Sequence, residues 1–262
     1  MELNKIYNMD CVQGMKLLDD CSVDLTVTSP PYDNLRSYKG FEFDFESVAK
    51  ELYRVTKDGG VVVWVVGDST VKGSETGSSF RQALHFKEIG FNLHDTMIYE
   101  KANPIPQNHN RYEQSFEFMF VLSKGKPNTF NPIKEPTIHY GEEMDWGNRK
   151  TKFDATQCRR DRPSEIIRVQ QFKTRKNIFK YSIGGGKTGH PAVFPETLAN
   201  DHILSWSNDG DLVLDCFMGS GTTAKMAMLN NRKYIGFELS EEYCEIAEQR
   251  IRKSTAQIGI GL

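Results

Sequence analysis

A glycine-rich turn near the C-terminal end limits the fold of this chain more than any other feature. The run Gly219-Ser220-Gly221-Thr222-Thr223-Ala224 fits the pattern G-x-G-x-x-G/A, directly after the strand pattern Leu212–Asp215 and at the start of a helix pattern. Glycines there permit a tight turn and close approach of a ligand, and helix N-terminal amides favour negative groups. Glu238 follows Gly219 by 19 residues, at the end of the next strand pattern, where an acid can bind both ribose hydroxyls. The pattern predicts a nucleoside cofactor; a structural turn with an N-terminal charge is the alternative.

The short distance from this turn to the end of the sequence narrows the choice of cofactor. Only 24 residues follow Glu238, enough for one helix and a tail, whereas a dinucleotide-binding fold needs a second βαβ half. The N-terminal half must therefore complete the sheet, which makes the order of elements circularly permuted. NAD and FAD are disfavoured, and S-adenosyl-L-methionine becomes the expected cofactor, with Glu238 and a second acidic residue as anchors of its adenosine.

Strand and helix patterns alternate in the N-terminal half. The β-branched run Asp24–Thr28 ends before Pro30 and Pro31, because two prolines in succession cannot continue a sheet ladder. Val61–Val66 is apolar at every position, as expected for a strand buried on both faces of a parallel sheet. This alternation predicts an α/β fold with a doubly wound, mostly parallel, Rossmann-like sheet. The other predicted elements are helices at 12–18, 45–52, 196–206 and from 241 onward, and strands at 96–99, 116–122, 212–215 and 234–238.

The segment between the two halves is basic and has no clear periodicity. From Asn131 to Lys180, twelve Lys and Arg residues stand against seven Asp and Glu, a net charge of +5, although the whole chain carries -2. A segregated basic segment points to a polyanionic partner better than the sum over the chain does. We therefore expect this segment, from Pro127 to about Gly189, to be an inserted or appended module that contacts a polyanion.

The predicted strand 24–28 ends in a turn that suits a planar amine. In Ser29-Pro30-Pro31-Tyr32 the prolines fix the backbone, so the Ser29 hydroxyl and the Pro30 carbonyl become rigid acceptors beside the flat ring of Tyr32. Doubly wound sheets place their chemistry at such strand ends. An amine can donate two hydrogen bonds to these acceptors, which push its nitrogen toward a geometry that attacks an electrophilic methyl group. A structural turn with a packed tyrosine is the alternative.

With both motifs in one chain, the sequence resembles the class β DNA amino-methyltransferases, which modify the exocyclic amine of cytosine or adenine. In that class the catalytic Ser/Asp/Asn-Pro-Pro-Tyr motif comes first, the target recognition region second and the cofactor loop last. Here these are Thr28–Tyr32, roughly residues 131–186, and Asp215–Thr223, and the resemblance extends from Lys5 to Arg252. It implies site-specific methyl transfer from S-adenosyl-L-methionine to a base flipped out of double-stranded DNA. A serine at the first motif position is associated with N4 of cytosine and an aspartate with N6 of adenine, so cytosine is favoured and adenine is the alternative.

The resemblance also implies roles for individual residues. Asp10 looks like the acid that contacts the cofactor adenine, although a helix cap is the alternative, and His190 looks like part of a segment that packs on the methionine moiety. Phe217 would flank the adenine, and Cys216 departs from the pattern because a proline is common there. The implied catalytic residues are Ser29, Pro30, Pro31 and Tyr32, and the implied cofactor-binding residues are Asp10, Cys11, His190, Pro191, Asp215, Phe217, Gly219, Ser220, Gly221, Thr222, Thr223 and Glu238. The basic candidates for DNA contacts are Arg149, Arg159, Arg160, Arg162, Arg168, Lys173, Arg175 and Lys176.

The remaining expectations concern location and partners. Five cysteines without a C-x-x-C pair argue against a disulfide framework and against a metal site. The longest apolar run, Val61–Val66, is far shorter than the roughly 20 residues that cross a bilayer, and the N-terminus has no secretory pattern. We expect a cytoplasmic enzyme of a bacterium, archaeon or phage that acts on double-stranded DNA and does not associate with a membrane. Two partners stay open: a second copy in a homodimer and a cognate restriction endonuclease. The competing hypotheses are a methyltransferase of RNA or small molecules and a non-catalytic nucleic-acid-binding module.

Overall fold

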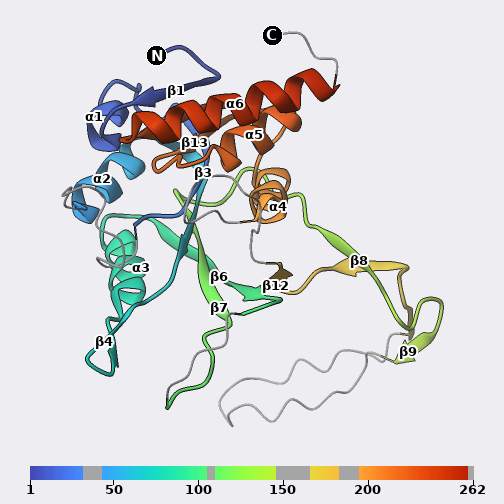
Figure 1. Ribbon diagram of the computed structural model, residues 1–262. Helices are drawn as coiled ribbons and strands as arrows, with labels where there is room; N and C mark the ends of the chain where they lie inside the picture. The colour runs from blue at the N-terminus through green and yellow to red at the C-terminus, as the bar shows by residue number, and fades with distance from the viewer. Residues whose placement is uncertain (32–42, 105–109, 146–165, 183–194, 259–262) are drawn as a thin grey trace. The chain divides into compact units, whose positions relative to one another are not determined.

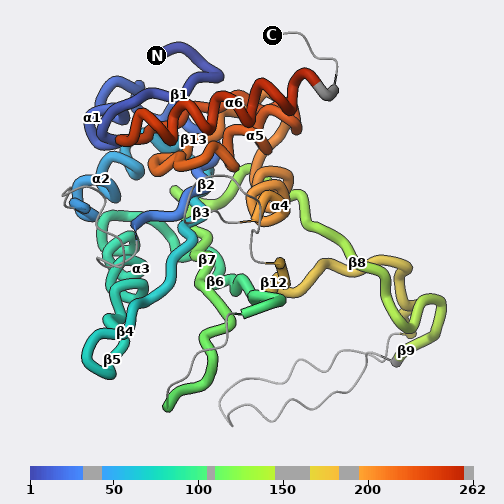
Figure 2. The backbone as a smooth tube through the Cα atoms, viewed as in Figure 1, coloured from blue at the N-terminus to red at the C-terminus, as the bar shows by residue number. Residues whose placement is uncertain are grey.

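The computed structural model describes residues 1–31, 43–104, 110–145, 166–182 and 195–258. The chain divides into two compact units, which can be followed in Figure 2: a large unit of Met1–Asn131 with Asn177–Leu262, and a small unit of Pro132–Lys176. Some of the predicted site residues lie outside the described ranges: Tyr32, Arg149, Arg159, Arg160, Arg162, His190 and Pro191.

The centre of the large unit is an eight-stranded sheet with the order β1-β14-β13-β2-β3-β7-β6-β12 (Figure 1). Neighbouring strands are parallel, except that β7 is antiparallel to both β3 and β6. The strands are β1 Lys5–Asn8, β2 Val23–Thr28, β3 Thr56–Val66, β6 Asn92–Lys101, β7 Phe116–Ser123, β12 Ile178–Tyr181, β13 Leu212–Asp215 and β14 Lys233–Glu238. The C-terminal strands β13 and β14 lie between β1 and β2, so both halves of the sequence build one sheet. The mostly parallel α/β fold is thereby confirmed, while the permutation stays a prediction.

Two groups of helices accompany this sheet. Helices α1 (Cys11–Met15), α2 (Phe45–Val55) and α3 (Ser78–Glu88) contact one another in turn, and so do α4 (Glu196–Trp206), α5 (Thr222–Leu229) and α6 (Glu241–Ile258). In β3, the run Val61–Val66 is buried at every position. Its even-numbered members belong to the hydrophobic cluster beneath α1–α3, so the odd-numbered members point to the opposite face. Burial on both faces explains why this strand has no polar alternation.

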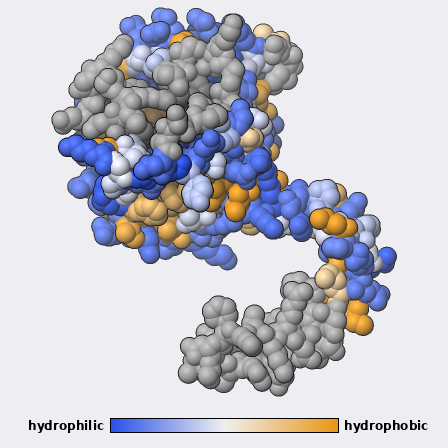
Figure 3. Space-filling model, turned by 60° about the horizontal axis from the view of Figure 1, so that its bottom comes forward, coloured by the Kyte–Doolittle hydropathy of each residue, from blue (hydrophilic) through white to orange (hydrophobic). Residues whose placement is uncertain are grey.

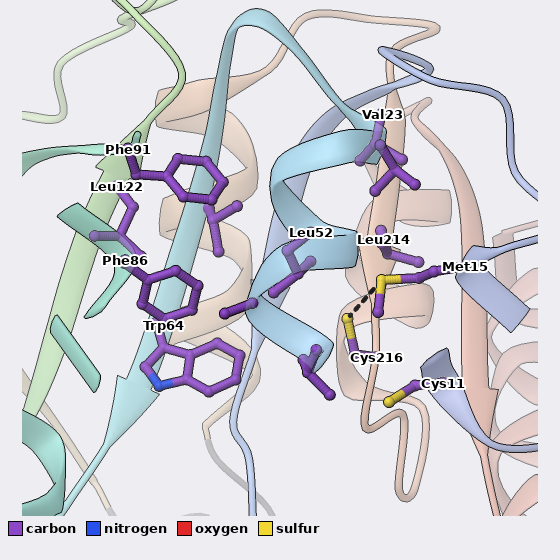
Figure 4. Close-up of a cluster of buried hydrophobic side chains, with 14 of the residues drawn as sticks. Cys11, Met15, Val23, Leu52, Trp64, Phe86, Phe91, Leu122, Leu214 and Cys216 are labelled. Carbon is purple, nitrogen blue, oxygen red and sulfur yellow. Dashed lines mark hydrogen bonds between the residues drawn. The ribbon is translucent and has the colours of Figure 1, made fainter. Parts of the chain in front are cut away.

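The hydrophobic cluster beneath α1–α3 is aromatic at one end and contains sulfur at the other (Figure 4). The rings of Trp64 and Phe86 lie edge to face with their centroids 5.2 Å apart, and Trp64 Nε1 donates a hydrogen bond of 2.9 Å to Gln82 Oε1. At the other end, the thiol of Cys216 points to Met15 Sδ at 3.9 Å. Because Cys216 directly follows β13, this contact fixes the start of the glycine-rich turn in the core.

Three elements of the sheet and its cover escape prediction, namely β1, α3 and β12. The predicted end of the inserted region also differs from the structure, because Ile178–Tyr181 pairs with β6 and the small unit ends at Lys176 instead of residue 186. Phe179 and Tyr181 in β12 are buried and their neighbours are exposed. This alternation covers only four residues, which is too short to stand out within a basic segment.

The small unit contains two antiparallel strand pairs. Strand β8 (Lys134–Pro136) pairs with β11 (Phe172–Thr174), and β9 (Glu143–Asp145) pairs with β10 (Ile166–Arg168). A further short pair, β4 (Thr70–Val71) with β5 (Ser74–Glu75), belongs to the large unit. The strands of the small unit have three residues each, and most of the side chains that the structure describes in this unit are exposed to solvent.

Exposed hydrophobic side chains occur in both units. They include Phe80 and Leu84 on α3 and Ile138 and Ile166 in the small unit, and Figure 3 shows areas of this kind in orange on one face. Among the described helices, none combines the length and the apolar character needed to span a membrane.

Candidate active site

The two sequence motifs meet where the sheet reverses its winding direction. After β2 the chain continues through α2 to β3, and after β13 it continues through α5 to β14, on the other side. Because β2 and β13 are adjacent and parallel, with Leu25 aligned with Val213, their carboxyl ends lie at the same edge. Ligands of open α/β sheets bind in the crevice at such a switch point. The Ser29 turn and the glycine-rich turn therefore come together at the place where this fold provides a site.

Two hydroxyl groups join the motifs directly. Thr28 Oγ1 donates a hydrogen bond of 2.6 Å to Asp215 Oδ1, and Thr223 Oγ1 donates one of 3.1 Å to the carbonyl of Val27. Both threonines and Asp215 are buried. Hydrogen bonds to a carboxylate in a buried setting are among the stronger ones. The end of β2 is thus bonded to the beginning and to the end of the glycine-rich turn.

The glycines of the turn are required by backbone conformation and by space. Gly219 has φ +51° and Gly221 has φ +78°, which is the left-handed region that favours glycine. A Cβ at Gly221 would lie 2.7 Å from Cβ of Ala247 in α6, so a side chain has no room there. Helix α5 begins at Thr222, immediately after this glycine. The predicted strand, turn and helix are all present.

Glu238, at the end of β14, lies beside the same turn. Its Oε2 accepts the N–H of Gly219 at 2.8 Å, its Oε1 accepts the N–H of Ser240 at 2.9 Å, and the residue is 6% exposed. Burial raises the pKa of Glu238, and these backbone donors act against that rise. Each carboxylate oxygen retains a second lone pair for a ligand hydroxyl. Glu238 therefore holds the turn from one side while it keeps acceptor capacity.

Asp215 is the second buried carboxyl of the site. It is 1% exposed, and burial raises its pKa to about 6, although the nearby hydroxyls of Thr28 and Thr223 and the N–H of Phe217 act in the opposite direction. Within the described residues neither Asp215 nor Glu238 forms an ion pair with a basic side chain. Two buried carboxyls beside a glycine turn suit a ligand that combines ribose hydroxyls with positive charge, and S-adenosyl-L-methionine has both.

Asp10, Cys11 and Phe217 are placed around this centre in different ways. Asp10 is the N-cap of α1 and accepts the N–H of Gln13 at 3.0 Å, so the helix cap that was the alternative for this residue exists; contact with a cofactor stays a prediction. Phe217 is half-buried and packs edge to face on Phe43, with ring centroids 5.5 Å apart. Cys11 lies in the hydrophobic cluster.

The cysteines near the site are poor nucleophiles. Burial raises the pKa of the Cys11 thiol to about 12 and that of Cys216 well above its ordinary value. Both thiols are therefore protonated near neutral pH, and a thiol is far less reactive than a thiolate. In the part of the chain that the structure describes, no group of three or more His, Cys, Asp and Glu side chains is arranged to hold a metal ion.

Ser29 and Pro30 follow the buried end of β2. Ser29 and Pro31 are half-buried, Pro30 is buried, and the preceding Thr28 is fully buried. The last residues of β2 are aligned with β3, with Thr28 opposite Trp64. The anchor of the turn is therefore rigid, and the aromatic member of the motif, Tyr32, lies outside the described residues.

Arg250 in α6 is a residue of the site that the sequence did not reveal. Its guanidinium donates to the carbonyl of Ser220, to Ser220 Oγ at 2.6 Å and to Glu196 Oε1 at 2.8 Å. Glu196, the first residue of α4, also accepts from Lys225 at 2.7 Å. Burial opposes ionisation of Glu196, but Lys225 and Arg250 hold its pKa below the ordinary value. Arg250 thus holds the turn at Ser220, next to the residue that Glu238 holds.

Asp68, just after β3, is a second residue that sequence reasoning missed. It is 9% exposed and accepts the N–H of Ser79 at 2.9 Å, the Ser79 hydroxyl and the Ser78 hydroxyl at 3.0 Å. Burial acts to raise its pKa, yet the Ser79 and Ser78 donors lower it overall. The N-cap position of α3 is Gly77, which has no side chain to cap with, so Asp68 supplies that acceptor. The available signal was the Ser78-Ser79 pair after Gly77, ten residues beyond Asp68, and it is too distant in the sequence to identify the partner.

The described basic candidates of the small unit differ in their surroundings. Arg168 on β10 and Lys176 are exposed, and Arg175 is half-buried. Lys173 on β11 is exposed but forms an ion pair of 3.2 Å with Glu135. A groove of about 340 Å³ in this unit is lined by Thr137, Met144, Ile167, Arg168, Val169, Gln170, Phe172 and Lys173.

Comparison with known proteins bears on what this arrangement does. The family model described as DNA methylase, N6_N4_Mtase, matches residues 23–249. The orphan methyltransferase M.BamHII of Bacillus amyloliquefaciens is 57% identical over 244 residues, which cover 90% of this chain and 91% of that protein. The Type II methyltransferase M.SmaI of Serratia marcescens is 30% identical over 291 residues, with 94% of this chain and 90% of that protein covered.

Solved structures resemble the chain in fold. PvuII DNA methyltransferase (cytosine-N4-specific) superposes with a TM-score of 0.70 at 22% identity, covering 97% of this chain and 91% of that one. The M1.HpyAVI–SAM complex superposes with a TM-score of 0.59 at 24% identity, covering 94% and 98%. At these identities the likeness extends to the fold and to nothing finer.

Proposed function

Because the chain belongs to the N6_N4 family of DNA methylases and is a site-specific, S-adenosyl-L-methionine-dependent DNA methyltransferase, we propose that its target is N4 of a cytosine. The meeting of the Ser29 turn with the glycine-rich turn, which Thr28 and Asp215 join by a hydrogen bond of 2.6 Å, supports methyl transfer at this place for either base. Serine at the first position of the catalytic motif supports cytosine, and adenine N6 is the alternative. PvuII DNA methyltransferase is named as cytosine-N4-specific, but its 22% identity does not extend that specificity to this chain.

The residues around the two turns suit the cofactor. Glu238 would bind the ribose hydroxyls, and Phe217 would flank the adenine, with Asp10 as the second acidic contact. His190 and Pro191, outside the described residues, would pack on the methionine moiety. When bound, S-adenosyl-L-methionine supplies a methyl group on a positively charged sulfur, and the buried carboxyls of Asp215 and Glu238 supply negative charge at that edge of the sheet.

The catalytic turn would act on the target amine by positioning. The Ser29 hydroxyl and the Pro30 carbonyl would accept the two amine hydrogens while the base stacks on Tyr32, so that the nitrogen lone pair turns toward the methyl group. Catalysis would come from orientation and from stabilisation of the positive charge that develops on nitrogen. Ser29 is too weak a base to take the proton, which would leave to water after transfer. A base in a duplex must first be flipped out, which costs a few kcal/mol of unstacking.

The small unit would supply the contacts that select a site on double-stranded DNA. Its residues, 132–176, carry eleven Lys and Arg against seven Asp and Glu. Basic side chains there would neutralise phosphates, and some would read guanine edges. The domain division into residues 1–130, 131–186 and 187–262 is proposed on the same grounds, with the second boundary moved to Lys176.

The proposal also extends to partners and location. The name of the relative M.BamHII includes the word orphan, which supports an enzyme that works without a cognate restriction endonuclease, whereas M.SmaI is named as a Type II methyltransferase. We propose a solitary enzyme of the cytoplasm. A homodimer is the alternative to a monomer, and the molecular mass in solution with and without duplex DNA distinguishes the two.

Sequencing with modification detection tests the choice of base. DNA is taken from cells that express the chain and from cells that express the Ser29→Ala variant. We expect N4-methylcytosine at one defined sequence in the first sample and none in the second. N6-methyladenine at a defined sequence, without N4-methylcytosine, would replace cytosine by the alternative and leave the fold and the cofactor unchanged.

A further inference from the structure

Strand β2, which leads into the catalytic turn, contains two buried threonines with opposite surroundings. Thr28 Oγ1 donates to Asp215 Oδ1 at 2.6 Å. Thr26 Oγ1 is buried without a hydrogen-bond partner among the described residues. Both residues have 0% exposure, and at two residues' separation they lie on the same face of the strand. Only one of two equivalent hydroxyls is therefore bonded to the cofactor half of the site.

We propose that Thr28 is a positioning residue that holds the catalytic turn and the cofactor turn in register, an inference that rests on the proposed function. Thr28 is joined by its peptide bond to Ser29 and by its hydroxyl to Asp215. Asp215 Oδ1 also accepts the N–H of Phe217 at 3.0 Å. A rotation of the Asp215 carboxyl therefore displaces Phe217, which would flank the adenine. Through Thr28 it also displaces Ser29, which would bind the target amine.

Steric and electrostatic surroundings leave Asp215 dependent on this hydroxyl. The carboxyl is buried, Glu238 of β14 acts on it as a like charge, and the thiols of Cys11 in α1 and Cys216 lie close enough for their pKa values to respond to it. In the described part of the chain no basic side chain forms an ion pair with Asp215. The donors that remain are hydroxyl and backbone groups, and the Thr28 hydroxyl is the one that lowers the pKa of Asp215 most.

The same geometry gives the pair a signature in pH. Burial raises the pKa of Asp215 to about 6, and the Thr28 hydroxyl opposes that rise by donating to the ionised form. Without the hydroxyl, the pKa of Asp215 is higher still, so less of the carboxylate is ionised at a given pH. If the ionised form holds the cationic cofactor, the acid limb of cofactor binding moves to higher pH.

The test compares Thr28→Val with Thr28→Ser and uses Thr26→Val as the matched control. Both valine variants remove a buried hydroxyl from β2. Only Thr28→Val also removes a hydrogen-bond donor from the Asp215 carboxylate. For Thr28→Val we expect the dissociation constant of S-adenosyl-L-methionine to rise about tenfold or more and kcat on duplex DNA to fall by a similar factor, with KM for DNA unchanged. Serine at 28 restores both quantities. The Thr26→Val variant behaves as the wild type.

The dissociation constant of S-adenosyl-L-methionine is measured by isothermal titration calorimetry between pH 5 and 8. A purely structural role of Thr28 would not change the pH dependence of this constant. The acid limb of cofactor binding shifts to higher pH in Thr28→Val and returns in Thr28→Ser. Equal effects of Thr28→Val and Thr26→Val, or a fall in melting temperature without change in binding, kcat or the pH profile, would overturn the role. Should Thr28→Val fail to fold, Thr28→Ala removes the same donor with a smaller side chain, and wild-type cofactor binding by that variant would equally contradict the role of Thr28.

These readouts separate the inference from the proposed function. Cofactor binding is measured without DNA, so the role of Thr28 in holding Asp215 is judged even where the modified base proves to be adenine. The converse outcome is also distinguishable. If the wild-type enzyme methylates cytosine but Thr28→Val binds the cofactor as Thr26→Val does, the proposed function stands and only the role of Thr28 is removed.

Discussion

The switch point of the large unit and the exposed basic residues of the small unit use polar side chains in opposite ways. At the switch point Asp215 and Glu238 are 1% and 6% exposed, and each accepts defined hydrogen bonds from neighbouring elements. In the small unit Arg168 and Lys176 are exposed on or beside strands of only three residues. Buried polar groups fix geometry, whereas exposed charges attract a partner and depend on salt. The molecule therefore separates a buried, hydrogen-bonded chemical site from basic side chains that are exposed to solvent.

Replacing Ser29, which we propose to lie at the target amine, gives the largest expected effect. If the Ser29 hydroxyl orients the amine as proposed, Ser29→Ala removes that acceptor, and we expect kcat to fall by about a hundredfold or more. The dissociation constant of S-adenosyl-L-methionine, measured by titration, should stay within about twofold because the cofactor turn is untouched. Activity close to that of the wild type would remove Ser29 from the catalytic machinery.

Changing the buried acid beside the turn should weaken cofactor binding strongly. In Glu238→Gln one amide N–H must face the N–H of Gly219 or Ser240, where an acceptor is needed. The affinity for S-adenosyl-L-methionine should fall about ten- to hundredfold, with a lower melting temperature. Glu245→Gln, on the exposed side of α6, is the control and should leave both unchanged. Unaltered affinity in Glu238→Gln would contradict a role in binding.

The support that Arg250 provides should matter less than Glu238 but remain measurable. Lysine at 250 keeps the charge and loses the fork that reaches Ser220 and Glu196 together, so Arg250→Lys should weaken cofactor binding by about tenfold. Arg252→Lys, two residues further along α6 in an exposed pair with Glu248, supplies the matched control. Similar affinities for the two variants would show that the turn does not depend on Arg250.

Single changes in the small unit should have the smallest effects. Arg168→Ala should raise KM for DNA by roughly threefold and reduce the salt dependence of binding, while kcat and cofactor affinity stay constant. Lys173→Ala should have less effect, because Glu135 at 3.2 Å already neutralises part of its charge. A large loss of kcat in either variant would break the separation between chemistry and recognition.

The sequence predicts the parts of the site that are local in the chain. The turn from Asp215 to Thr223 and the acid at Glu238 are recognisable because residue type, spacing and strand pattern coincide. Val61–Val66 is recognisable as a strand because its uniform apolar character leaves few other structures. Asp10 shows the limit of such reasoning. Its position in the sequence is compatible with both a ligand contact and a helix cap, and the structure shows the cap.

Contacts between distant elements escape prediction for a physical reason. Arg250 reaches Ser220 across 30 residues, and Thr28 reaches Asp215 across 187, so neither pair leaves a periodic trace in the sequence. Strand β12 is recognised only through its pairing with β6, because four alternating residues in a basic segment do not define a strand. Contact partners that are distant in the sequence can be identified only from the folded structure, in which the sheet brings the ends of β2, β13 and β14 together.

The most direct test of the account is the product formed from methyl-labelled S-adenosyl-L-methionine with duplex DNA, RNA of the same sequence and free nucleosides. After digestion and separation, we expect label in N4-methylcytosine from the duplex alone, and none from Ser29→Ala. Label in RNA or in free nucleosides, or transfer to duplex DNA that persists in Ser29→Ala, would contradict a DNA-specific site built where the two turns meet.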